Sequence, residues 1–229
     1  MKTIGIIGGM SWESTATYYK LMNTYTRDLM GGLHSAKLII FSVDFHEIEY
    51  YQSRGEWEKC AEKMILAAQA LERAGADFIV ISTNTMHNVA TQVKASVKIP
   101  LLHIAEATSR VLKDAGHTKV ALLGTKYTMQ LDFYKDVLKA NGIEVLIPNI
   151  QEIDEINRII FEELCVGVIL ETSRKYYQKA ILKLQENGAQ AVILGCTEIG
   201  MLIEHSDCNI PVFDTTEIHA KAAVDCANK

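Results

Sequence analysis

The sequence predicts an α/β protein of two pseudo-symmetric lobes, each a parallel sheet flanked by helices, with two half-sites that face one ligand. The first observation behind this prediction is an internal repeat. Residues 75–83 (GADFIVIST) match residues 188–196 (GAQAVILGC), so Thr83 and Cys196 occupy equivalent positions. Two further pairs keep the same order and nearly the same spacing: residues 4–9 with 120–125, and residues 99–100 with 210–211. The second observation is that continuous Val/Ile/Leu runs alternate with helical patterns, which is typical of parallel sheets covered on both faces.

In the first half of the chain, short apolar runs alternate with segments of helical periodicity. Residues 3–7 are predicted to form a buried strand, and residues 11–30 an amphipathic helix with Glu13 in its first turn. Residues 57–74 also have helical periodicity, which stops at Gly75, a residue suited to a helix C-terminus. The other elements expected here are strands at 38–43, 78–82 and 101–104 and a helix at 86–95.

The second half repeats this order. Strands are expected at 120–123, 144–147 and 191–194, and helices at 130–141, 152–163 and 174–187. A last strand at 212–213 and a helix at 217–227 are expected to return to the first lobe, because Ile210-Pro211 mirrors Ile99-Pro100. The predicted domains are therefore residues 1–100 plus 208–229, and residues 101–207.

Composition narrows the class of protein. The 229 residues are 48% hydrophobic and 22% charged, as in soluble globular proteins, and a net charge of −5 without a basic stripe argues against a nucleic-acid partner. The apolar start is too short for a signal peptide, and no run reaches the roughly 18 residues of a membrane span. We therefore expect a cytoplasmic protein with no membrane partner. The five cysteines are scattered without CxxC spacing, which indicates neither a disulfide framework nor a metal site.

Polar motifs follow several of the predicted strands. They are Gly8-Gly9-Met10-Ser11, Thr83-Asn84-Thr85, Gly124-Thr125 and Cys196-Thr197-Glu198. Ligands of parallel sheets bind at the carboxyl ends of the strands, where backbone NH groups and hydroxyls can hold a small carboxylate. Each motif alone has an ordinary structural interpretation: Thr83 as a helix N-cap, Cys196 as a small buried hydrophobic residue, and Glu198 as a solvated carboxylate of a first helical turn. Their symmetric positions favour a functional role.

Three runs resemble the signatures of the aspartate/glutamate racemase family. They are Gly8 to Ser11, Thr83 to His87, and Leu194 to Ile199, and their order and spacing match across the whole chain. The GGM opening and the Cys-Thr-Glu run resemble the aspartate racemase branch of the family.

The resemblance implies a cofactor-independent transfer of the α-proton of a small amino acid, with two thiols on opposite faces of the α-carbon. It also implies two lobes with the active site in the cleft between them, and a homodimer. Catalytic roles carry over to Thr83 and Cys196. The residues expected to contact the substrate are Met10, Ser11, Gln52, Arg54, Asn84, Thr85, Thr197 and Glu198.

The chain departs from the family pattern at Thr83, where most members have a cysteine. A thiol at a helix N-terminus can have a lowered pKa, so a thiolate is expected at Cys196, whereas a threonine hydroxyl is a poor base. Because the resemblance assigns the C-terminal cysteine to the face of the L-enantiomer, we expect the enzyme to prefer L-amino acids. Net racemisation is then slow, while proton exchange on one face is fast.

The substrate and the reaction class remain open at this point. Aspartate racemases often carry a basic residue before a glycine of the second lobe, where this chain has Val166; Gln52, Arg54 and Arg174 are the remaining candidates to bind a substrate side chain. Aspartate or glutamate is the first expectation, and a small polar amino acid such as homoserine the next. The alternatives are a single-cysteine decarboxylase or isomerase of the same superfamily, similar to arylmalonate decarboxylases, and a non-catalytic amino-acid-binding module.

Overall fold

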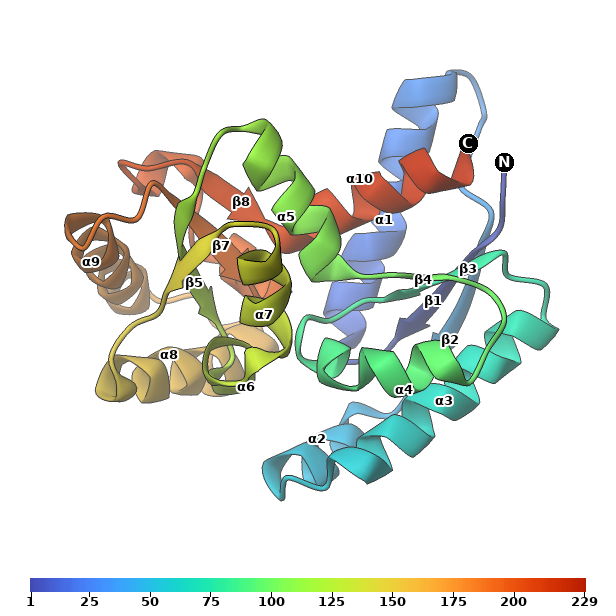
Figure 1. The fold of residues 1–229 in the computed structure, drawn as a ribbon, viewed down its shortest axis with the longest axis horizontal. Helices are drawn as coiled ribbons and strands as arrows, with labels where there is room; N and C mark the ends of the chain where they lie inside the picture. Colours follow the sequence, from blue (N-terminus) through green and yellow to red (C-terminus); the bar gives the residue numbers. More distant parts are fainter. The chain divides into compact units, whose positions relative to one another are not determined.

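The computed structural model describes all 229 residues, which form two compact units. The first unit comprises Met1–Ile104 and His219–Lys229, and the second comprises Ala105–Ile218. Each unit contains a parallel four-stranded sheet with the same topology, so the expected α/β class with two lobes of parallel sheet is confirmed. The elements of both units are labelled in Figure 1.

The sheet of the first unit has the strand order β2-β1-β3-β4. Its strands are β1 (Ile4–Gly8), β2 (Leu38–Ser42), β3 (Phe78–Ile81) and β4 (Leu101–Leu102), and its helices are α1 (Trp12–Met30), α2 (Phe45–Ser53), α3 (Trp57–Arg73), α4 (Ala90–Ala95) and most of α10 (Thr215–Ala227). The two central strands are buried along their whole length. Their apolar runs therefore lack the polar alternation of a strand with one solvated face.

Helices cover both faces of this sheet, as the alternation of side chains along β1 and β3 shows. Ile4, Ile6, Phe78 and Val80 pack with side chains of α1 and α10, such as Tyr18 and Val224. On the opposite face, Ile7, Ile79 and Ile81 pack with α3, through residues such as Met64 and Leu71. Burial of this many apolar side chains, at about 25 cal/mol per Å² of apolar surface, is the main stabilising contribution to the unit.

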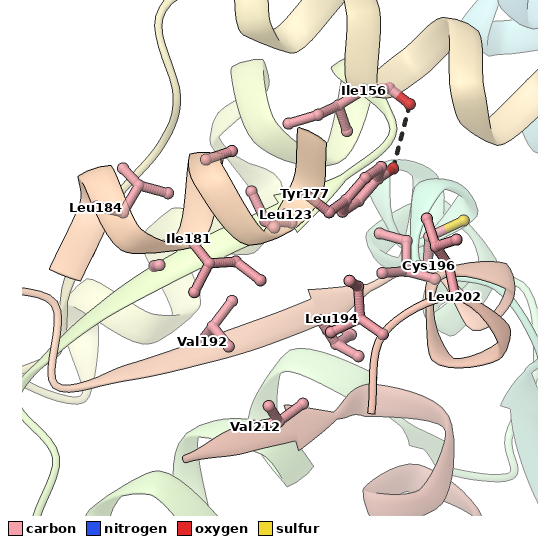
Figure 2. Packing of buried hydrophobic residues seen from close by; sticks show 14 of the residues in the cluster. Leu123, Ile156, Tyr177, Ile181, Leu184, Val192, Leu194, Cys196, Leu202 and Val212 are labelled. Atoms are coloured by element: carbon pink, nitrogen blue, oxygen red, sulfur yellow. Dashed lines mark hydrogen bonds between the residues drawn. The ribbon is translucent and has the colours of Figure 1, made fainter. Parts of the chain in front are cut away.

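The second unit repeats the arrangement with the order β6-β5-β7-β8. Its strands are β5 (Lys119–Gly124), β6 (Glu144–Leu146), β7 (Ala191–Gly195) and β8 (Val212–Asp214), and its helices are α5 (Ile104–Asp114), α6 (Lys126–Gln130), α7 (Asp132–Ala140), α8 (Ile150–Glu162) and α9 (Glu171–Glu186). One face of the sheet packs against α8 and α9, where Tyr177 and Ile181 lie over Val192 and Leu194 (Figure 2). Cys196 belongs to the same cluster of buried side chains.

The last strand corrects one expectation. β8 pairs with β7 in the second sheet, with Val192 opposite Val212, so the prediction that residues 212–213 return to the first lobe is wrong. Ile210-Pro211 precedes β8 as Ile99-Pro100 precedes β4, and both strands lie at an edge of their own sheet. Only the following helix returns: the chain crosses between units at 104–105 and again at 218–219, whereas the predicted boundaries were 100–101 and 207–208.

Three helices were not expected from the sequence: α2, α5 and the short α6. α2 contains Tyr50, Tyr51 and Gln52, and its N-cap Asp44 accepts a hydrogen bond from the backbone NH of His46 at 3.1 Å. α5 follows β4 directly and has a buried face that includes Leu112. No helix in the structure combines the length and apolar character needed to cross a bilayer.

Candidate active site

The loop after β1 is held in a fixed shape by a glycine and a threonine. Gly9 has φ of 90°, and a Cβ there would lie 2.2 Å from the carbonyl oxygen of Val43, so only glycine fits. The Gly9 NH donates to Thr15 Oγ1 at 2.8 Å, and Ser11 caps α1 by accepting from the NH of Ser14 at 3.2 Å. Met10 is buried in the apolar cluster against α3, which indicates a packing role.

A group of buried hydroxyls joins this loop to the end of β3. Ser82 Oγ donates to the carbonyl of Ile7 at 3.1 Å, and Ser14 Oγ donates to the carbonyl of Ser82 at 2.9 Å. Thr15 Oγ1 lies 3.4 Å from Ser82 Oγ. The three hydroxyls therefore fix the backbone immediately before Thr83. No sequence pattern pointed to these hydroxyls, although Ser82 adjoins a predicted site residue and stands where the second repeat has Gly195.

Thr83 is half-buried directly after this anchored segment, and its hydroxyl makes no hydrogen bond within the chain. It does not cap a helix, because the short 3-10 helix Thr85–Val89 has Asn84 at its N-cap position without a side-chain cap bond. Asn84 and Thr85 are buried beside it. The carbonyl oxygen of Thr83 accepts a hydrogen bond from His87 Nδ1 at 2.8 Å. Thr83 thus combines a fixed backbone with an available hydroxyl.

Cys196 follows β7 at the equivalent point of the second unit and is 9% exposed. Its Sγ donates to Glu198 Oε2 at 3.0 Å. Burial, followed by the nearby Glu198 carboxylate, raises the pKa of the Cys196 thiol well above its ordinary value. The expected lowering of this pKa by a helix N-terminus is wrong, because the hydrogen bond from the Glu198 backbone is outweighed by burial and by the carboxylate. The resting group is a thiol with a proton acceptor in contact.

The residues after Cys196 are tied to the start of α10. Thr197 Oγ1 accepts from Thr216 Oγ1 at 3.2 Å, and Thr215 Oγ1 donates to the carbonyl of Leu194 at 2.8 Å. Glu198 is 6% exposed, so the ordinary interpretation of a solvated first-turn carboxylate does not hold. Asp214 accepts the backbone NH of Thr216 at 2.7 Å, and burial raises the pKa of its carboxyl to about 6.

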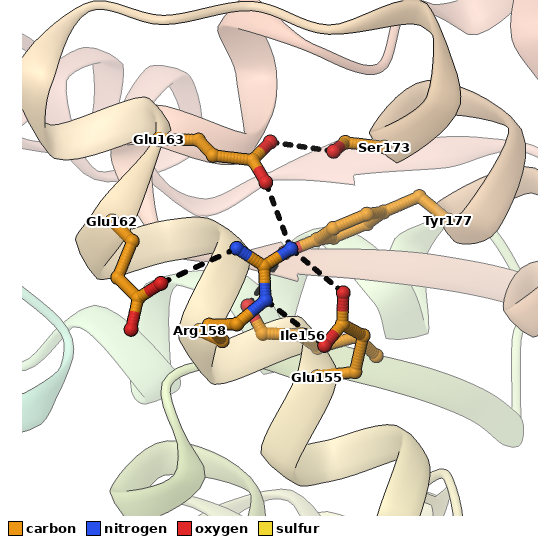
Figure 3. Close-up of polar contacts among 7 residues, drawn as sticks. All are labelled: Glu155, Ile156, Arg158, Glu162, Glu163, Ser173 and Tyr177. Atoms are coloured by element: carbon orange, nitrogen blue, oxygen red, sulfur yellow. Dashed lines mark hydrogen bonds and ion pairs between the residues drawn. The ribbon is translucent and has the colours of Figure 1, made fainter.

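A second polar group of this unit surrounds Arg158 (Figure 3). Its guanidinium bonds Glu155 at 2.7 Å and Glu163 at 2.8 Å, and Glu162 lies within 3.4 Å. Glu163 is 7% exposed and also accepts from Ser173 Oγ. Three carboxylates thus neutralise Arg158, which leaves no free cation there. Val166, at the position where the resemblance led us to expect a basic residue, is largely exposed.

The remaining predicted contacts to a substrate side chain differ in their surroundings. Gln52 is 4% exposed on α2, whereas Arg54 is exposed, lies over the ring of Tyr50 at 3.7 Å and donates to its carbonyl at 3.1 Å. Arg174 donates to the carbonyl of Leu202 and pairs with Asp207 at 2.9 Å. The structure therefore joins Ser11 to the Thr83 segment through hydroxyls and leaves Arg54 and Arg174 with local partners.

Comparison with known proteins gives the family of the chain. The family model described as Asp/Glu/Hydantoin racemase matches residues 7–223. The broad specificity amino-acid racemase RacX of Bacillus subtilis is 27% identical over 228 residues, which cover 96% of each chain. Among solved structures, a candidate Asp/Glu racemase from Yersinia pestis is 51% identical with a TM-score of 0.94. An aspartate racemase homologue from Pyrococcus horikoshii is 40% identical with a TM-score of 0.87, and both structures match over 100% of each chain. The chain belongs to the Asp/Glu/Hydantoin racemase family and is a pyridoxal-phosphate-independent isomerase.

Proposed function

We propose that this chain racemises a small polar amino acid without a cofactor, with Cys196 acting on the face of the L-enantiomer and Thr83 standing in place of a second cysteine. The observation that carries the proposal is the buried Cys196–Glu198 pair at the end of β7, whose repeat equivalent at the end of β3 is Thr83. Both side chains follow strands at the carboxyl edge of a parallel sheet, where such folds bind ligands. The proposal requires that both reach the same α-carbon.

The proton steps follow from the groups at each position. The Cys196 thiol passes its proton to Glu198, and the resulting thiolate removes the α-proton of the L-amino acid, leaving the electron pair on the α-carbon. If Cys196 returns a proton, the L-form is regenerated. If the Thr83 hydroxyl delivers its proton to the other face, the D-form is produced. Water then reprotonates the threonine oxygen, and Glu198 gives up its proton to the hydroxide that this leaves, so all three groups return to their starting states.

This arrangement is asymmetric in rate. A neutral alcohol is a very weak base, so Thr83 removes the α-proton of a D-amino acid far more slowly than a thiolate removes that of an L-amino acid. The equilibrium between enantiomers is unaffected by the enzyme. Slow proton abstraction from the D-form therefore also means slow net racemisation of the L-form, and one-sided exchange is the faster process.

Aspartate or glutamate is the proposed first substrate, and homoserine or a similar small polar amino acid the next. The aspartate racemase homologue from Pyrococcus horikoshii supports the first choice, and the broad specificity of RacX from Bacillus subtilis supports the second. The ion pairs of Arg158 and Arg174 leave no free buried guanidinium to select a dicarboxylate, which also favours a range of polar side chains. We further propose that the protein is a homodimer, which sedimentation equilibrium tests. We also propose that it is cytoplasmic, which cell fractionation tests.

The deciding experiment incubates L- and D-aspartate, glutamate and homoserine with the enzyme in D2O. NMR measures loss of the α-hydrogen, and chiral chromatography of the same samples measures the opposite enantiomer. We expect the preferred L-substrate to gain α-deuterium faster than D-product appears, and the D-form to exchange more slowly. Equal exchange from both enantiomers would refute the one-sided mechanism. Binding without exchange of any substrate would identify an amino-acid-binding module instead.

A further inference from the structure

Three imidazoles lie together inside the first unit, next to the segment that carries Thr83. The ring centroid of His87 lies 4.6 Å from that of His103 and 5.8 Å from that of His219. His87 and His219 are 2% and 0% exposed. Burial lowers the pKa of His87 well below its ordinary value and the pKa of His103 and of His219 to about 4, so all three rings are neutral near pH 7.

The bonds of His87 specify a single tautomer. Nδ1 lies 2.8 Å from the carbonyl oxygen of Thr83, which can only accept, so Nδ1 carries the proton. Nε2 lies 3.2 Å from the backbone NH of Ile104, which can only donate, so Nε2 is the acceptor. A protonated ring, or the Nε2–H tautomer, would place two hydrogens against each other at Ile104.

The other end of this group is also fixed by the backbone. His219 Nε2 donates to the carbonyl of Leu102 at 2.9 Å, and its Nδ1 accepts from the hydroxyl of Tyr18 at 3.0 Å. Ile104 ends the first segment of this unit, and His219 begins the second. His219 therefore links the point where the chain re-enters the unit to Leu102, close to the point where the chain leaves it. His87 links that exit point, at Ile104, to Thr83.

The Thr83 carbonyl needs such a partner because the sheet does not supply one. β4 pairs with β3 only at Ile79 and Val80, and β3 itself ends at Ile81, so Thr83 lies beyond the ladder. Because the hydrogen bond to His87 holds the Thr83 peptide, this peptide cannot rotate freely, and the Thr83 side chain stays in its position. A displacement of about 1 Å in a reacting group can cost on the order of a hundredfold in rate.

We propose that His87, as the neutral Nδ1–H tautomer, is a positioning residue that aims the Thr83 hydroxyl for proton delivery on one face of the substrate. This inference rests on the proposed role of Thr83. The inference predicts different effects on net racemisation and on α-hydrogen exchange, whereas a purely structural role of His87 would change both rates together. Loss of the His87–Thr83 bond should slow the step that needs Thr83, which is net racemisation, and spare the α-hydrogen exchange that needs only Cys196.

Two substitutions remove the two bonds of His87 separately. Asparagine places a donor near the position of Nδ1, so His87→Asn keeps a donor for the Thr83 carbonyl and loses the acceptor for Ile104. Glutamine reaches the position of Nε2, so His87→Gln keeps the acceptor and loses the donor. The assay measures, in D2O, the ratio of D-product formation to α-hydrogen exchange of the L-substrate, with circular dichroism and thermal melting as folding controls.

We expect His87→Gln to lower this ratio by roughly tenfold or more, with exchange within about threefold of the wild type, and His87→Asn to keep the ratio within about twofold. Equal ratios in the two variants would overturn the proposal. If the wild type shows no exchange at all, the proposed function fails instead. A long-range ¹H–¹⁵N spectrum of the wild type tests the tautomer independently of activity and of the variants' folding: an Nδ1–H signal for His87 supports the proposal, and an Nε2–H signal overturns it.

Discussion

Acidification should destabilise the first unit through His219, and the size of the effect follows from the structure. The pKa of His219 is lowered from 6.5 to about 4 by burial, with the ring bonded to Leu102 and Tyr18. Between these two values the unfolded chain binds a proton that the folded ring does not, so the free energy of unfolding falls as pH falls through this window. At about 1.36 kcal/mol for each pKa unit, His219 accounts for about 2 kcal/mol of stability lost by pH 5 and about 3 kcal/mol in all.

The variant His219→Gln isolates this contribution, because glutamine can still donate to the Leu102 carbonyl and does not titrate. Urea denaturation, followed by far-ultraviolet circular dichroism, gives the free energy of unfolding of both proteins at pH 7, 6 and 5. The wild type should be the more stable at pH 7, and its advantage should shrink by about 2 kcal/mol at pH 5. Parallel pH profiles of the two proteins would show that His219 is not held neutral by the fold.

The remaining predictions concern the candidate site. Cys196→Ala should lower α-hydrogen exchange to below a tenth of the wild type with the fold unchanged, and activity above that level would remove Cys196 from the proposed role. Glu198→Gln should slow exchange because it removes the carboxylate that takes the thiol proton, even though loss of this negative charge lowers the pKa of Cys196. Faster exchange at neutral pH would show that the only effect of Glu198 is to oppose ionisation of the Cys196 thiol. Thr83→Cys should allow D-substrate turnover, measured by chiral chromatography, and a folded variant without it would contradict the assignment of Thr83. Gly9→Ala should cost about 3 kcal/mol or more in urea denaturation, since a Cβ meets a carbonyl at 2.2 Å, whereas Gly31→Ala, with similar φ and open space, should cost about 1 kcal/mol.

Most of the fold could be predicted from the repeat and from the continuous apolar runs, because such runs indicate strands that are buried on both faces. The duplicated segments mark β3 and β7, and the central strands of both sheets are buried on both faces, as their continuous Val/Ile/Leu runs indicate. The error at β8 came from giving the mirrored Ile-Pro pair the wrong meaning. Equivalent positions in a repeat predict equivalent places in separate sheets, and the pairing of Val212 with Val192 agrees with that rule.

The candidate site was less predictable, because its electrostatics depend on contacts that sequence spacing does not reveal. Cys196 stands at a strand end, as expected, but its burial and the contact with Glu198 reverse the expected direction of its pKa shift. The Ser14 hydroxyl and the Ser82 carbonyl that it binds, 68 positions apart, meet only in the folded unit. The pairing of His87 with Ile104 likewise depends on how β4 and the following segment return to the sheet.

The crossing of the chain at 218–219 determines the order in which the protein can be completed during synthesis. Ala220, Ala223 and Val224 cover one face of a sheet whose strands were all made more than a hundred residues earlier. Until residues 219–227 leave the ribosome, Ile4, Ile6 and Val80 lack this cover and expose apolar surface, which is the condition that favours aggregation of nascent chains. The first unit to be translated is therefore the last to complete its fold. A chain truncated before residue 219 would lack the helix that covers this face of the first sheet, and the apolar side chains there would stay exposed.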